Sequence, residues 1–306
     1  MTKIESVHKT VLLNETIDGL NLKQDSVVLD ATFGGGGHSR EILKRFPKVK
    51  VIALDQDKSV WDGNEKRISF HNENFRDLDK VLNVSPKSDL GEAPSLTWGK
   101  KVDGIIFDLG LSSDQLENSG RGFSFLKGEP LLMTMKKNPS EEDLTAGEIV
   151  NTWEEKNLAD IIYGYGEERF SRRIAKGIVE ARAKAEIKTT TDLVKIISDS
   201  VPAVYRRARL HFATRTFQAL RIAVNDELRS LQTGLEKGFD ALKEGGRMSV
   251  ITFHSLEDRI VKKFYKKMEQ EGKATLINKK PILENEENLK KNPRARSAKL
   301  RILEKI

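Results

Sequence analysis

The sequence contains no cysteine, which excludes disulfide bonds and thiolate metal sites and makes the cytoplasm the expected compartment. No apolar run approaches the roughly 20 residues of a membrane-spanning helix. The first residues also lack the basic-then-apolar order of an export signal. Aromatic residues are scarce at 7%, but hydrophobic residues make up 38% of a 306-residue chain. We therefore expect a soluble globular protein of one elaborated domain or two modest ones, with no membrane contact.

Positive charge exceeds negative charge, with 53 lysines and arginines against 46 acidic residues and a net charge of +7. A basic balance favours a polyanionic partner. Two segments stand out because they contain no acid, one between Asp199 and Asp226 and one between Lys290 and Arg301. An ordinary solvated face is the competing interpretation, whereas phosphate contact predicts binding that weakens steeply with salt. The candidate RNA-binding residues are Arg206, Arg207, Arg209, Arg215, Arg294 and Arg296.

The first third of the chain alternates β-branched runs with amphipathic stretches, as consecutive βα units do. Such units form an α/β fold with a mostly parallel sheet. Strands are predicted over residues 26–32, 49–55, 68–72 and 102–109, and helices over 38–46, 58–66 and 76–82. Residues 83–100 carry prolines and glycines among polar residues and are predicted to be a surface loop.

No strand is expected for roughly a hundred residues after Gly110, where helical patterns cover 154–185 and 191–200. The βα rhythm then resumes, with helices over 214–243 and 255–270 and strands over 247–254, 274–278 and 298–304. A crossover of this length cannot be a mere connection. We therefore expect an α/β domain of residues 1–115 and 211–306 that is interrupted by a helical insertion of residues 116–210.

A run of four glycines from Gly34 to Gly37 follows the first predicted strand and precedes a helix. Glycines at this place let the backbone approach a ligand at the carboxyl edge of the sheet. The dinucleotide pattern G-x-G-x-x-G lacks its third glycine here, and the G-x-x-x-x-G-K-[ST] phosphate loop is absent. A tight turn without any ligand is the structural alternative.

Two aspartates narrow the choice of ligand. Asp30 ends the first strand and could hold a cationic group such as an aminoacyl ammonium, whereas it would repel a diphosphate. Asp55 ends the second strand, about twenty residues beyond the loop, where a carboxylate can accept ribose hydroxyls. Dinucleotides and S-adenosylmethionine both satisfy Asp55, but Asp30 and the missing glycine favour S-adenosylmethionine as the cofactor.

Several blocks of the sequence together resemble one known family. They are DATFGGGGHS (30–39), DLGLSS (108–113), RGFSF (121–125), TRTFQALRIAVN (214–225), TFHSLEDR (252–259) and NPRARSAK (292–299). In this order they resemble the bacterial ribosomal RNA small subunit methyltransferase H (MraW-like) family. The resemblance implies a Rossmann-like, S-adenosylmethionine-dependent methyltransferase whose helical insertion recognises the substrate. It also implies methylation of the exocyclic N4 of a decoding-centre cytidine in 16S ribosomal RNA of the small ribosomal subunit.

The resemblance also assigns cofactor contacts to individual residues, each of the expected type. Three departures from the family's pattern accompany them. Residues 130–136 read PLLMTMK where the family usually reads PLDMRMD, and Asp114 and Phe212 stand where proline is usual. The first departure lies near the expected substrate mouth and concerns target choice or activity. The implied cofactor contacts are Gly36, Gly37, His38, Asp55, Phe75, Asp108 and Gln115.

The catalytic candidates are Asp108, Phe253 and His254. Asp108 ends the fourth strand and is placed to accept a hydrogen from the cytosine amine, as an orienting acceptor rather than a proven base. Phe253 ends the fifth strand and could stack on an unstacked base or pack in the core. His254 could contact substrate or cap the helix at Ser255, where Ser255-x-x-Asp258 resembles a capping box. No metal-binding cluster is evident, and methyl transfer from a sulfonium needs no metal.

Other functions remain open at this point. The altered 132–136 stretch allows a catalytically impaired RNA-binding or ribosome-assembly factor that keeps the cofactor pocket. A DNA amino-methyltransferase usually carries two prolines at the fourth strand, and Asp108-Leu109-Gly110-Leu111 has none. A nicotinamide dehydrogenase is disfavoured by the missing third glycine. The sequence leaves the oligomeric state open, with a homodimer as one option.

Overall fold

The computed structural model describes residues 10–61, 63–83 and 101–306. The loop expected over 83–100 lies outside the described residues except for Asn83, which ends a helix. The chain forms two compact units, one of Met1–Gly110 with Leu228–Ile306 and one of Leu111–Glu227. None of the helices in the described ranges is long and apolar enough to cross a bilayer.

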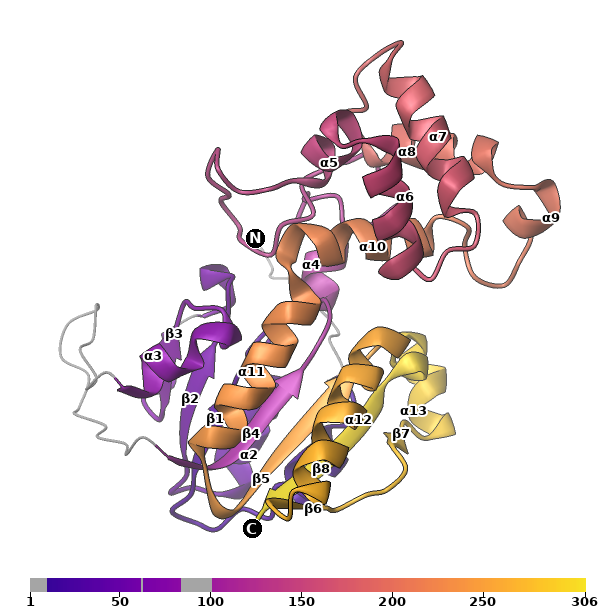
Figure 1. Cartoon of the computed structure of the whole chain (residues 1–306). Helices are drawn as coiled ribbons and strands as arrows, with labels where there is room; N and C mark the ends of the chain where they lie inside the picture. Colours follow the sequence, from indigo (N-terminus) through magenta and orange to yellow (C-terminus); the bar gives the residue numbers. More distant parts are fainter. Residues whose placement is uncertain (1–9, 62, 84–100) are drawn as a thin grey trace. The chain divides into compact units, whose positions relative to one another are not determined.

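The first unit is built on one mixed sheet, in the order β3-β2-β1-β4-β5-β8-β6, with β7 paired to β8 (Figure 1). The five strands from β3 to β5 run parallel, whereas β8 runs antiparallel to β5, β6 and β7. The predicted α/β class with a mostly parallel sheet is therefore confirmed. The strands are β1 (Val27–Asp30), β2 (Lys50–Leu54), β3 (Ile68–His71), β4 (Val102–Asp108), β5 (Leu242–Thr252), β6 (Ala274–Leu276), β7 (Ile282–Leu283) and β8 (Lys299–Lys305).

Helices cover both faces of this sheet because its central strands are apolar on both sides. On β4, Ile105 and Phe107 point into one core and Ile106 into the other, as strand alternation requires. The first core includes α3 (Leu78–Asn83), α11 (Glu227–Ala241) and α12 (Ser255–Gln270), of which α11 and α12 are drawn in front of the sheet in Figure 1. The opposite core includes α1 (Leu13–Gly19) and α2 (Gly37–Arg45).

Some local predictions for this unit are wrong. The helix predicted over 58–66 is only the 3-10 turn Lys58–Val60, which Asp57 caps by accepting a hydrogen bond from the Ser59 amide. Gly63 follows with a φ of +75°, a conformation that ends helical geometry. The fifth strand begins earlier than predicted and ends at Thr252. The short elements β7 and α13 (Glu286–Lys291) were not predicted.

The second unit is helical around its own apolar core. That core joins residues from five helices and includes Ile149, Ile162, Ile174, Leu193 and Phe217. The helix predicted over 154–185 is broken into α6 and α7 around Glu167, whose φ of 50° is left-handed. The helices are α4 (Ser113–Glu117), α5 (Ala146–Thr152), α6 (Glu155–Gly164), α7 (Ser171–Arg182), α8 (Thr190–Ser200), α9 (Ala203–Arg206) and α10 (Thr214–Asn225).

The boundary of the helical unit differs from the predicted insertion of residues 116–210. It extends to Glu227 because α10 places Phe217 and Leu220 in the helical core. The continuous helix predicted over 214–243 is interrupted at Asp226, whose φ of 48° is left-handed. After that break, α11 belongs to the first unit. Its role as a substrate-recognition domain stays a prediction.

Two helical glycines offer a test of the packing in the first unit. A Cβ at Gly234 of α11 would lie 2.8 Å from Cδ2 of Phe75, so Gly234→Ala should lower the free energy of unfolding by about 1–3 kcal/mol. At the exposed Gly164, where no atom lies within 4 Å of a built Cβ, the same change should raise it by up to about 1 kcal/mol. Urea unfolding measures both, and equal shifts would contradict the packing of Phe75 on α11.

Candidate functional site

Three aspartates meet at the carboxyl edge of the parallel strands. Asp30 is the last residue of β1, Asp108 the last of β4, and Asp55 directly follows β2. β1 lies between β2 and β4, with Asp30 opposite Ala53 on one side and Ile106 on the other. The strand order reverses between β1 and β4, and ligands of open α/β sheets bind at such a switch point.

Asp30 is 1% exposed and fastens the start of α2 to the sheet. Its Oδ2 accepts a hydrogen bond from Oγ of Ser39 at 2.5 Å, and its Oδ1 accepts one from the Thr32 amide at 3.2 Å. Burial raises the pKa of Asp30 to about 6, against the opposing effect of these two hydrogen bonds. The geometry gives Asp30 a structural part, and its contact with a cationic ligand group stays a prediction.

The glycine loop is held open by Asp55. The Asp55 oxygens accept the amides of Gly34 and Asp57, each at 2.8 Å. Gly36 has a φ of 68° and precedes the first residue of α2. A Cβ at Gly37 would lie 1.9 Å from Oγ1 of Thr10, so only glycine fits beneath that side chain. The loop therefore presents backbone at the start of α2.

Asp108 is the most strongly perturbed acid of the site. Its side chain keeps 23% of its accessible area, and Oδ2 lies 3.6 Å from Nδ1 of the buried His38. Its backbone amide donates to Oγ1 of Thr32 at 2.6 Å. Burial raises the pKa of Asp108 to about 8, and repulsion from Asp30 and Glu257 adds to the shift. A cation at this edge would favour the ionised carboxylates.

Two half-buried phenylalanines lie in the same unit. Phe75 meets Phe107 edge to face, with ring centroids 5.6 Å apart. Phe253 follows β5 and lies against Gly110, where a built Cβ would be 3.2 Å from Cδ2 of the ring. Gly110 comes two residues after Asp108, so Phe253 lies beside the segment that follows β4. Phe253 packs beside an apolar cluster and also keeps exposed surface. Both predicted roles, packing in the core and stacking on a base, are compatible with this position.

His254 caps α12, and its partner was missed by the sequence argument. Nδ1 of His254 accepts the Glu257 amide at 3.4 Å, while Glu257 Oε2 accepts the amides of His254 at 3.2 Å and Phe253 at 2.8 Å. The capping box predicted from Ser255 and Asp258 is therefore wrong. Asp258 instead pairs with Arg301 and Lys299. Contact between His254 and substrate stays a prediction.

Gln115 belongs to the second unit and also makes a local cap. The side-chain Oε1 of Gln115 accepts a hydrogen bond from the Ser112 backbone amide at 3.0 Å. The backbone amide of Gln115 donates to Oγ of Ser112 at 3.1 Å. The spacing Ser112-x-x-Gln115 could have indicated this capping box from sequence. Its assignment to the cofactor stays a prediction.

The predicted RNA-binding arginines are at the surface. Arg206, Arg207 and Arg209 are exposed around α9, and Arg294 and Arg296 are exposed in the 3-10 turn Pro293–Ser297 of the first unit. Arg215 is half-buried and donates to the carbonyl of Glu167 at 2.9 Å. Surface position is what phosphate contact requires, and the contact itself stays a prediction.

Further cations beside α9 were not predicted. The buried carboxylate of Glu168 accepts the hydroxyl of Tyr205 at 2.5 Å and the amide of Phe170 at 2.8 Å. The Arg169 guanidinium lies over both rings, 4.8 Å from Phe170 and 5.2 Å from Tyr205, and Arg173 lies 5.8 Å from Phe170. These stacked cations extend the basic surface that begins at Arg206.

Residues 132–136 depart from the family's pattern, but hydrogen bonds from other residues fix their backbone. Arg121 Nη1 donates to the carbonyls of Thr134 at 3.2 Å and Met135 at 2.6 Å. Asn225 accepts the Met135 amide and donates to the carbonyl of Met133, both at 2.8 Å. Arg121 and Asn225 lie in blocks that carry the resemblance. The departures therefore change the side chains of a segment whose backbone is fixed by expected residues.

The raised pKa of Asp108 predicts a pH dependence of stability. The folded protein keeps this proton to about pH 8, whereas the unfolded chain loses it near the ordinary value of 3.8. Between those values the unfolded state binds fewer protons, so stability falls as pH rises. In Asp108→Asn the free energy of unfolding should fall less between about pH 5 and about pH 8 than in the wild type. Urea titrations measure this, with exposed Asp25→Asn as the control, and an unchanged slope would contradict the shift.

Solved structures resemble this chain weakly over almost its full length. A putative rRNA methylase from Clostridium thermocellum matches with a TM-score of 0.44 and 12% identity, covering 98% of this chain and 100% of its own. A putative methyltransferase from Streptococcus mutans in complex with SAH matches with a TM-score of 0.43 and 13% identity, covering 97% and 99%.

Sequence comparison gives a much closer match. A ribosomal RNA small subunit methyltransferase H from Clostridium botulinum (strain Kyoto / Type A2) is 45% identical over 99% of this chain and 100% of its own length. A ribosomal RNA small subunit methyltransferase H from Paenibacillus sp. (strain JDR-2) is 42% identical over 98% of this chain and 99% of its own length. The model of the MraW methylase family matches residues 5–306. The chain belongs to the MraW methylase family and is a methyltransferase that uses S-adenosylmethionine.

Proposed function

We propose that this protein transfers a methyl group from S-adenosylmethionine to the exocyclic N4 of a cytidine in the decoding centre of 16S ribosomal RNA. The observation that carries the proposal is the full-length identity of 45% to a ribosomal RNA small subunit methyltransferase H. The acids at the switch point support the proposal, with Asp108 at the end of β4 and Asp55 beside the glycine loop.

The residues at the switch point fit the cofactor. Gly36 and Gly37 present bare backbone at the start of α2, where side chains would meet Phe33 or Thr10. Asp55 lies beside the glycine loop just after β2, where a carboxylate can accept ribose hydroxyls. The acids Asp30 and Asp108 suit the cationic part of the ligand. When bound, S-adenosylmethionine supplies an activated methyl group on a sulfonium.

Asp108 then acts on the target amine. The cytosine N4 is a poor nucleophile because its lone pair is delocalised into the ring, so catalysis depends on orientation. The ionised carboxylate accepts an amine hydrogen and turns the nitrogen toward the methyl group. Holding the reactants in line can supply on the order of 7–11 kcal/mol of the barrier. Phe253, beside Gly110, offers a ring on which the flipped base stacks.

The reaction is tested with small ribosomal subunits that lack this modification. The subunits are incubated with purified protein and labelled S-adenosylmethionine, and the digested RNA is examined by mass spectrometry. N4-methylcytidine at one site is expected. If calorimetry shows cofactor binding but no methyl appears in RNA, the protein is an RNA-binding or assembly factor instead.

Paired variants separate binding from turnover. Asp55→Asn should weaken S-adenosylmethionine binding by about 10- to 100-fold, because it removes a charge-assisted hydrogen-bond acceptor. Asp108→Asn should change binding less but lower kcat by about 100-fold, within the usual range for proton-accepting groups. Calorimetry and initial rates give the two values. An unchanged rate in Asp108→Asn would remove its catalytic assignment.

A further inference from the structure

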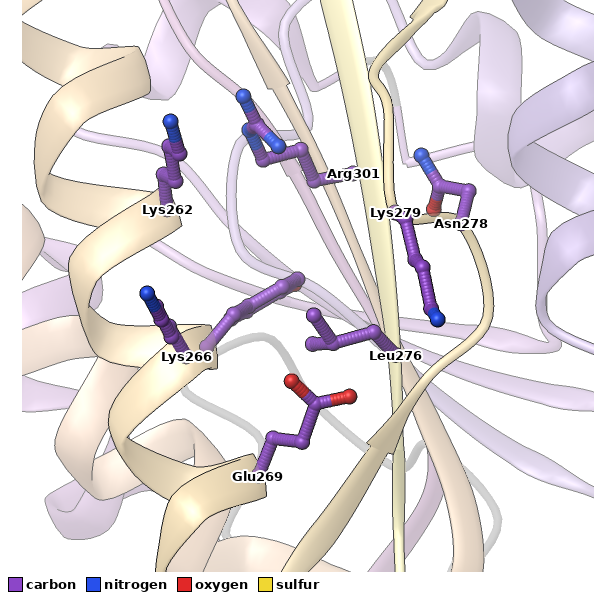
Figure 2. A pocket seen from close by; sticks show the side chains of 8 residues that line it. Lys262, Lys266, Glu269, Leu276, Asn278, Lys279 and Arg301 are labelled. Atoms are coloured by element: carbon purple, nitrogen blue, oxygen red, sulfur yellow. The ribbon is translucent and has the colours of Figure 1, made fainter.

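A basic pocket lies between α12 and the antiparallel end of the sheet (Figure 2). Four of its lining side chains are cationic and one is acidic. We call it the α12 pocket. Its lining residues are Lys262, Tyr265, Lys266, Glu269, Leu276, Asn278, Lys279 and Arg301.

Arg301 is the fixed cation of the α12 pocket. It projects from β8 and is 7% exposed, so its guanidinium cannot rearrange freely. Its Nε donates to Asp258 at 2.7 Å, and Asp258 also pairs with Lys299 at 3.1 Å. Figure 2 shows the guanidinium of Arg301 between α12 and the segment that carries Asn278 and Lys279. The Asp258 carboxylate thus orients Arg301, and its single negative charge is shared between Arg301 and Lys299.

The lysines of the pocket lack acidic partners. Lys262 and Lys266 are one turn apart on α12, and like charges at this spacing destabilise a helix. Among the described residues, no carboxylate lies within 4.0 Å of the ammonium of Lys262, Lys266 or Lys279. By contrast, Lys267 of the same helix lies 3.9 Å from Glu271. A bound anion would relieve the repulsion that the protein itself leaves uncompensated.

The far wall of the pocket is pinned to the sheet. Asn278 accepts the Ile302 amide at 2.8 Å and donates to the carbonyl of Leu300 at 3.1 Å, which fixes the backbone before Lys279. Tyr265 forms part of the lining with its hydroxyl turned inward, where it donates to the carbonyl of Met248 at 2.8 Å. The pocket therefore offers cationic donors and an engaged phenol, which match phosphate better than a nucleobase.

We propose that the α12 pocket binds phosphate groups of the RNA backbone. The inference rests on the proposed function, since it supplies a second contact for the same substrate. α12 begins beside Phe253 and His254, and Lys262 lies roughly 10 Å further along the helix axis. A strand that leaves the reacting base along α12 would pass the pocket. Arg301 contributes a fixed fork of donors, and the three lysines contribute mobile charge.

The test compares two double variants of the full-length protein on the same helix. Lys262→Gln/Lys266→Gln removes two of the three pocket lysines. Lys263→Gln/Lys267→Gln removes two positive charges from the neighbouring positions of α12. The probe is an RNA hairpin unrelated to 16S RNA, titrated between about 50 and about 200 mM salt. The pocket variant should bind about tenfold more weakly at low salt. Its slope of log K against log salt should be shallower by about 1.5, at 0.7–0.9 per lost phosphate contact.

The control variant should stay within about twofold of the wild type in affinity. Equal losses of RNA affinity in the two variants, or no loss in either, would overturn the proposal that the α12 pocket binds phosphate. Loss of binding to anionic phospholipid vesicles without loss of RNA binding would overturn it as well. Wild-type methylation of small subunits is measured in parallel. If methylation fails while the pocket variant still shows the RNA defect, the proposed function fails and the phosphate site stands.

Discussion

Two carboxylates at the ends of adjacent strands, Asp30 and Asp108, dominate the electrostatics of the candidate site. The pairing of β1 with β4 brings Asp30 and Asp108 to the same edge of the sheet. Burial raises the pKa of Asp30 to about 6 and that of Asp108 to about 8, and each is raised further by repulsion from a neighbouring acid. A cation at this edge would favour the ionised form of both carboxylates.

The glycine loop depends on the same hydrogen-bond network. Thr32 links the Asp30 carboxylate to the backbone of Asp108, since its amide donates to Asp30 Oδ1 and its hydroxyl accepts the Asp108 backbone amide. Ser39 ties Asp30 to the first turn of α2, and Asp55 holds Gly34. The loop is thus fixed at both ends by acids before any ligand binds. This preorganisation lowers the ordering cost of cofactor binding.

The basic residues fall into two physical classes. Arg301 and Lys299 share Asp258, so part of the basic C-terminal segment is anchored to α12 rather than free in solution. Arg206 and Arg296 are exposed and are suited to long-range attraction of a polyanion. The basic residues therefore include cations held in a fixed geometry by ion pairs and cations exposed to solvent.

The sequence alone determined the elements with strong local signals. The glycine run after β1, the acids that end parallel strands and the amphipathic α12 are set by spacing, so the sheet edge and its cofactor could be predicted. The resemblance added the residue assignments. The helix over 58–66 failed because an aspartate cap and a positive-φ glycine outweigh weak periodicity.

Only the tertiary structure decided which distant residues meet. The left-handed Asp226 divides one amphipathic run between two cores, because Phe217 and Leu231 pack in different clusters. The partner of His254 was Glu257 rather than a Ser255 and Asp258 pair, since Asp258 is drawn to Arg301, more than forty residues away. Local patterns state which face of an element is buried. Long-range packing selects the partner, because burial and charge pairing are satisfied only across the assembled sheet.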